Sequence, residues 1–138
     1  IVLPDLHEVY SAHVGGGATC NGQPLPVVRP GPILDTECVS YSEDTLFAFP
    51  SYRIPGRMRY NGAFVAEAAF MAKGAFRGII SLRANLYDIA AAVVILTELR
   101  AEFRGVNGQA IDLREVVANG QMPFPFVIFP KDSGFCIA

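Results

Sequence analysis

The chain has 138 residues, the usual length of one domain, and 51% of them are hydrophobic while 17% are charged. This composition predicts an ordered globular protein and excludes an intrinsically disordered one. Eleven basic and thirteen acidic residues leave a net charge of -2, with no cluster of lysine and arginine, so we do not expect nucleic acid as a partner.

The apolar runs and the cysteines bear on where the protein resides. The longest apolar run, residues 89–96, is far shorter than the roughly 18 residues of a membrane span, so we expect no membrane partner. Cys20, Cys38 and Cys136 are odd in number and show none of the short spacings of zinc or thiol redox sites. We interpret them as small buried side chains in a reducing compartment, which predicts a cytoplasmic protein.

The first part of the chain predicts a β-hairpin. Residues 7–14 are rich in strand formers, residues 15–17 are glycines, and a second short strand begins at Ala18. The glycines are interpreted as a hairpin turn rather than a phosphate cradle, because no Lys followed by Ser or Thr comes after them at the start of a helix.

A proline-rich segment, residues 24–32, breaks regular structure and is the best candidate for a domain boundary. We expect residues 1–27 to be the trailing hairpin of an antiparallel-sheet domain, and residues 28–138 to be a C-terminal α/β domain. Because the chain opens directly on the strand-like Ile1 without a methionine, we also expect that it has been cut or processed.

Helices and strands alternate in the remaining sequence. A helix over residues 62–73 is predicted by its apolar stripe, with Asn61 as its cap, and a second helix carries Asp88 and ends near Leu99. Short strands are predicted at residues 37–41, 46–49, 78–82, 101–104, 111–113 and 124–129. The alternation predicts an α/β fold, a layered sandwich with a mixed, largely parallel sheet flanked by helices.

Asp88 is the most informative single residue. It lies in the first turn of an alanine-rich helix, at the partly positive end, where a carboxylate can hold a cation or orient a water beside a bound anion. Taken alone, it could equally be a helix-start acid that stabilises the helix dipole by about 0.3–1 kcal/mol.

Three blocks of the sequence are similar to motifs of one protein family, and the second and third also have the order and spacing of that family. Residues 8–22 contain Gly-Gly-Gly-Ala and Asn-Gly, residues 59–75 contain Asn-Gly-Ala and later Ala-Lys-Gly-Ala, and residues 86–98 begin Leu-Tyr-Asp and continue with small residues. Together they resemble the C-terminal part of the inositol monophosphatase family.

The resemblance implies a function and a set of site residues. It implies that Asp88 is a ligand of catalytic magnesium and contacts the substrate, and that Gly62 and Ala63 lie near the substrate phosphate and ring. It further implies a magnesium-dependent phosphatase acting on a small sugar or polyol phosphate monoester, and a homodimer.

Several positions depart from the family pattern. Tyr87 stands where the family usually has Trp, Ala63 replaces a Ser or Thr and so lacks a hydroxyl, and Ser81 stands where animal inositol enzymes carry a substrate-binding Glu. The family's metal-binding loop, Asp-Pro-Ile/Leu-Asp-Gly-Thr, is absent. One carboxylate cannot build a magnesium site, so no catalytic residue is assigned and we expect the isolated chain to be inactive. The alternative is a non-catalytic binding or assembly module that keeps the fold.

Overall fold

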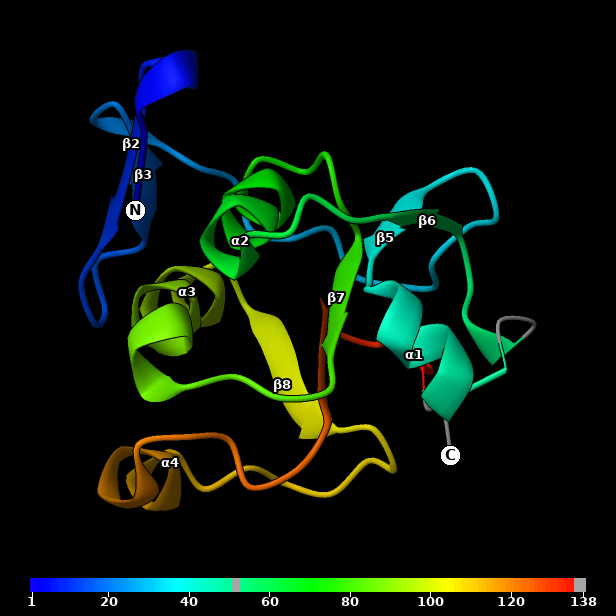
Figure 1. The fold of residues 1–138 in the computed structure, drawn as a ribbon. Helices are drawn as coiled ribbons and strands as arrows, with labels where there is room; N and C mark the ends of the chain where they lie inside the picture. Colours follow the sequence, from blue (N-terminus) through cyan, green and yellow to red (C-terminus); the bar gives the residue numbers. More distant parts are fainter. Residues whose placement is uncertain (51–52, 136–138) are drawn as a thin grey trace.

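The N-terminal residues form a small antiparallel sheet. In the computed structural model, which describes residues 1–50 and 53–135, its strands are β1 Val2–Leu3, β2 Glu8–Ala12, β3 Ala18–Cys20 and β4 Gln23–Pro24, with a 3-10 helix at Pro4–Leu6. The strands are ordered β1-β2-β3-β4 (Figure 1). Tyr10 pairs with Cys20 and Ala12 pairs with Ala18, which confirms the predicted hairpin.

The second sheet has five strands and is mixed. Its strands are β5 Cys38–Ser40, β6 Arg57–Arg59, β7 Gly78–Ser81, β8 Ala101–Gly105 and β9 Phe126–Pro130. They are ordered β6-β5-β7-β9-β8. The β6–β5 and β5–β7 pairs are parallel, whereas β9 is antiparallel to both β7 and β8. Four of the five strands therefore run in one direction, as expected for a mixed, largely parallel sheet.

The helices form layers with the two sheets. The four helices of the described residues are α1 Glu43–Ala48, α2 Phe64–Ala72, α3 Leu86–Glu98 and α4 Leu113–Asn119. Helices α2 and α3 lie between the N-terminal sheet and the five-stranded sheet, and α1 lies on the far side of the latter (Figure 1). The chain is thus a layered α/β sandwich.

The strand period of two divides the side chains of the five-stranded sheet between two cores. Phe126 and Ile128 of β9 pack toward α2 and α3, in the cluster that also contains Tyr10 and Leu96. Val127 belongs to the second cluster, against which residues of α1 pack. Both faces of the sheet are covered, as its parallel part requires.

Two predicted strands are wrong. Residues 46–49 belong to α1 and its C-terminal cap, and residues 111–113 lead into α4. Helix α1 begins with two acids, which favour a helix start. Helix α4 is capped by the Asp112 carboxylate, which accepts a hydrogen bond from the Arg114 N–H at 2.9 Å, and it ends at Gly120. Both helices are too short for a helical period to stand out in the sequence.

The predicted cap of α2 is also wrong. Ala63, not Asn61, is the N-cap residue, and no side chain caps the helix. Gly62 has φ of +75°, a left-handed conformation that starts the helix two residues later than the apolar pattern predicts.

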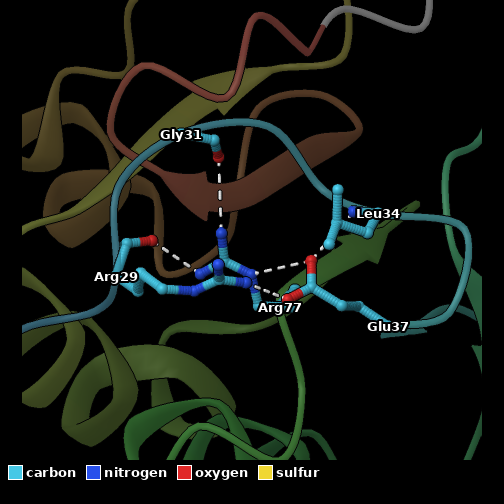
Figure 2. Close-up of polar contacts among 5 residues, drawn as sticks. All are labelled: Arg29, Gly31, Leu34, Glu37 and Arg77. Atoms are coloured by element: carbon cyan, nitrogen blue, oxygen red, sulfur yellow. Dashed lines mark hydrogen bonds and ion pairs between the residues drawn. The ribbon is translucent and has the colours of Figure 1, made fainter.

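A buried ion pair fastens the segment between the two sheets. The Arg77 guanidinium, only 6% exposed, donates to the Glu37 carboxylate and to the carbonyl oxygens of Arg29 and Gly31 (Figure 2). Glu37 also accepts from the Leu34 N–H at 2.8 Å and forms an ion pair with Arg29. The segment that follows the first sheet is therefore tied to the residue before β7.

Two further expectations can be compared with the structure. Cys20 and Cys38 are free thiols but only half-buried, because each lies at the margin of the core rather than within it, and Cys136 lies outside the described residues. No helix in residues 1–50 and 53–135 is both long enough and apolar enough to cross a membrane.

Candidate functional site

The N-terminal ends of α2 and α3 open into one cavity of about 460 Å³. Its wall includes Gly62 and Ala63 before α2 and Asp88 in the first turn of α3. The structure therefore brings together the three residues that the sequence resemblance singled out. The other polar side chains on the wall are those of Ser42, Asp44, Tyr60, Glu67, Ser81 and Arg83.

The N-terminal end of α2 lies on the cavity wall, whereas the first N–H group of α3, at Leu86, donates to the Gly120 carbonyl oxygen at 2.8 Å. The first N–H groups of a helix have no acceptor within the helix, and neither α2 nor α3 has a side chain that caps them. Gly62, Ala63, Phe64 and Val65 all line the cavity, and nothing lies within 4 Å of the place where a side chain on Gly62 would begin. The open, partly positive end of α2 is therefore suited to an anion.

Asp88 is held at the start of α3 with most of its hydrogen-bonding capacity free. The Asn85 amide donates to the Tyr87 hydroxyl at 2.8 Å and reaches Asp88 Oδ2 at only 3.5 Å. Among the described residues Asp88 forms no ion pair. Its carboxylate is half-buried on the cavity wall, where it can accept a cation.

Glu67 is a second carboxylate of the cavity that the sequence analysis missed. It accepts a hydrogen bond from the Asn61 N–H at 3.1 Å. Burial raises the pKa of Glu67, while the Asn61 and Gly62 N–H groups and the Ser40 hydroxyl oppose this by favouring the charged form. Ser40 is buried beside Glu67, but its hydroxyl has no hydrogen-bond partner with good geometry among the described residues. The available signal was the position of Glu67 four residues after Ala63, on the same face of the helix.

Ser81 and Arg83 form the part of the wall between β7 and α3. The Ser81 hydroxyl donates to the Arg83 carbonyl oxygen at 3.0 Å, so it stabilises this loop. The Arg83 guanidinium brings a positive charge to a wall that otherwise carries Asp44, Glu67 and Asp88. No pattern in the sequence indicates Arg83 as a site residue, or Asp44, which lies on the unpredicted helix α1.

The described residues can supply one ligand to a magnesium ion, but they do not form a complete magnesium site. Within residues 1–50 and 53–135, no group of three or more His, Cys, Asp and Glu side chains is arranged to hold a metal. Mg²⁺ prefers six oxygen ligands, of which the Asp88 carboxylate can supply one.

The far end of α3 is fastened to the hairpin. The Glu98 carboxylate accepts hydrogen bonds from the Gly15 and Gly17 N–H groups, both at 2.9 Å. These N–H groups lower the pKa of Glu98. The glycines form the predicted hairpin turn, and their contact with Glu98, which the sequence did not predict, holds α3 at the end opposite Asp88.

The comparison with protein families decides the relationship. The sequence profile described as the inositol monophosphatase family matches residues 1–126. The chain belongs to the inositol monophosphatase family. This confirms the resemblance drawn from the three sequence blocks.

Individual members of the inositol monophosphatase family match over about half their length. The chain is 28% identical over 130 residues to the inositol-1-monophosphatase ImpA of Mycolicibacterium smegmatis, covering 84% of the chain and 47% of that protein. It is 29% identical over 125 residues to a fructose-1,6-bisphosphatase/inositol-1-monophosphatase of Thermotoga maritima, covering 85% of the chain and 48% of that protein.

Solved structures of the family show the same fold. Inositol monophosphatase II from Staphylococcus aureus superposes with a TM-score of 0.78 at 19% identity, over 96% of this chain and 53% of that one. An IMPase/NADP phosphatase complexed with Mg²⁺ and phosphate gives a TM-score of 0.70 at 25% identity, over 95% of this chain and 47% of that one. The α/β sandwich with a mixed sheet is therefore the fold of this family, and the chain spans about half of it.

Proposed function

We propose that this chain is the C-terminal part of a magnesium-dependent phosphatase that acts on a small sugar or polyol phosphate monoester. The observation that carries the proposal is the cavity at which the N-terminal end of α2, which no side chain caps, meets Asp88 in the first turn of α3. Two related structures are bound to inositol monophosphate or D-inositol-1-phosphate, which supports a phosphorylated polyol as the substrate. The related structure with Mg²⁺ and phosphate supports the metal.

In this proposal the chain contributes phosphate binding and one metal ligand. The N–H groups of Ala63 and the first turn of α2 receive phosphate oxygens. The Asp88 carboxylate is one oxygen ligand of magnesium, which when bound lowers the pKa of a coordinated water and neutralises the phosphate. Ser81 and Arg83, which also line the cavity, face the alcohol part of the ester, and Ser81 stands where animal inositol enzymes carry a Glu.

No group of three or more His, Cys, Asp and Glu side chains in residues 1–50 and 53–135 is arranged to hold a metal, so the proposed site needs further ligands. We propose that they belong to the half of the family fold that the chain does not span, so that the isolated chain is inactive. In this arrangement residues 1–27 complete an N-terminal antiparallel-sheet domain, and residues 28–138 form the C-terminal α/β domain. We further propose a cytoplasmic homodimer.

The second candidate function is a non-catalytic binding or assembly module that retains the fold. It is favoured by the presence of only one expected metal ligand in the described cavity. The two functions differ in a property that can be measured, the release of phosphate.

Magnesium-dependent phosphate release separates the two functions. The assay compares the 138-residue chain with a longer protein that contains this chain together with the metal-binding half, using inositol 1-phosphate and fructose 1,6-bisphosphate. We expect release by the longer protein only when Mg²⁺ is added, and none by the chain alone. A longer protein that folds, binds these esters and releases no phosphate with Mg²⁺ would support the binding module instead.

A further inference from the structure

Glu67 is a buried carboxylate that has no positively charged partner among the described residues. Glu67 is only 4% exposed, and no ion pair among the described residues includes it. Burying a charge without a counter-charge is unfavourable unless hydrogen bonds satisfy it. Here the bond is made with backbone, because the Asn61 N–H donates to Glu67 Oε1 at 3.1 Å.

That hydrogen bond fixes the turn that leads into α2. Side chains of a helix lean toward its N-terminus, so Glu67 in the first turns of α2 reaches back past Ala63 to Asn61. Gly62 lies between them in its left-handed conformation, at φ of +75°. The direction of the N–H groups that face the cavity depends on this turn, and no side-chain cap on α2 holds it otherwise.

We propose that Glu67 is a positioning residue, which holds the Asn61–Gly62 turn in the shape that receives a phosphate group. The inference rests on the proposed function, since it concerns the phosphate site of the same cavity. Glu67 acts through the backbone and makes no contact with the substrate. Its acceptor oxygen is the feature that matters, whereas its negative charge opposes the binding of an anion nearby.

Two substitutions of similar size separate the acceptor from the charge. Glu67→Gln removes the charge and keeps an oxygen that can accept from the Asn61 N–H. Glu67→Met removes both, and a methionine fills a buried position well. Inorganic phosphate is titrated into each form of the 138-residue chain, and binding is followed by the NMR shifts of the Gly62 and Ala63 amides. Amide shifts in β8, which pairs only with β9 and contributes no residue to the cavity wall, check that each variant is folded.

We expect Glu67→Gln to bind phosphate at least as tightly as the unchanged chain, and Glu67→Met to bind about fivefold more weakly than Glu67→Gln, the factor that one typical hydrogen bond supplies. Equal affinity of the two variants would overturn the positioning role while leaving the proposed function intact. Absence of phosphate binding in the unchanged chain would instead contradict the phosphate site of the proposed function, and the positioning role with it.

A measurement on the unchanged chain gives a second test that does not depend on the folding of a variant. The Asn61 amide, bonded to Glu67, should exchange its hydrogen with solvent much more slowly than the amides of an open turn. Exchange at the rate of an unprotected amide would overturn the proposal.

Discussion

Replacing Arg77 with methionine should be one of the most destabilising single substitutions of a charged residue in this chain. The Arg77 guanidinium contacts Glu37 at 3.1 Å and the Arg29 carbonyl oxygen at 2.6 Å, with a weaker contact to the Gly31 carbonyl at 3.4 Å (Figure 2). Arg77→Met leaves the carboxylate without its buried partner and leaves the two carbonyl groups without a donor. Each of these groups then loses hydrogen bonds that water cannot fully replace.

The size of the effect follows from how buried each partner is. Breaking a buried ion pair by removing one partner typically costs 3–5 kcal/mol. The Arg77 side chain is 7% exposed, but that of Glu37 is 17% exposed and keeps its contacts with Arg29 and the Leu34 N–H. We therefore expect the low end of the range, about 3 kcal/mol, or roughly a hundredfold change in the folding equilibrium.

Urea denaturation followed by circular dichroism measures this change. The matched control is Arg104→Met, because Arg104 pairs with Glu102 at 3.3 Å but its side chain is 51% exposed. An exposed pair of this kind contributes about 0–1 kcal/mol. If Arg77→Met lowered the free energy of unfolding no more than Arg104→Met, the reasoning that the buried pair fastens the segment to the sheet would be refuted.

Two further predictions concern α3. Leu96 is fully buried, so Leu96→Ala should lower the free energy of unfolding by about 3 kcal/mol in urea denaturation, whereas Val94→Ala on the exposed side of α3 should change it by well under 1 kcal/mol. Similar losses for the two variants would contradict the observed burial. The Gly15 and Gly17 N–H groups lower the pKa of Glu98 in the folded chain from its ordinary value of 4.5. Glu98 therefore stabilises the fold at pH values above 4.5, and this contribution is lost as the pH falls through the lowered pKa. In thermal melts, Glu98→Gln should therefore be less stable than the unchanged chain at neutral pH and nearly as stable in strong acid. If the melting temperatures of the two proteins differed equally at both pH values, the charge of the carboxylate would not be responsible.

Elements with a long or regular pattern were predictable from the sequence. The thirteen residues of α3 show a clear helical period, and the hairpin is marked by glycines between two strand-like runs. Helices α1 and α4 were missed because six or seven residues carry too little pattern. The Asp112 cap and Gly120 were available as signals for α4, but residues 111–113 were interpreted as a strand instead.

The site was predictable where a motif carried it. Asp88, Gly62 and Ala63 were selected by resemblance, and the structure places them on one cavity wall. Contacts between distant positions could not be read from spacing, since Arg77 and Glu37 are 40 residues apart and Glu98 and Gly15 are 83 apart. Such contacts depend on how the layers pack, which no local pattern records.

The Glu67 hydrogen bond was missed for a different reason. Glu67 and Asn61 are only six positions apart in the sequence, but their contact depends on the left-handed turn at Gly62. If the helix began at residue 62, as the apolar pattern predicts, the Glu67 side chain would lie beside backbone groups other than the Asn61 N–H.

The most direct test of the proposed site is the effect of Asp88→Asn on magnesium-dependent phosphate release, measured in a protein that joins this chain to a metal-binding half, as the proposed function requires. Asp132→Asn is the control, because Asp132 is exposed and lies in a turn with φ of +57°, which asparagine also adopts readily. The account predicts that Asp88→Asn lowers the rate at least about 100-fold, since a metal contributes several kcal/mol to such a reaction, and that Asp132→Asn leaves it unchanged. A rate for Asp88→Asn within about twofold of the unchanged protein would contradict the role of this cavity as the metal and phosphate site.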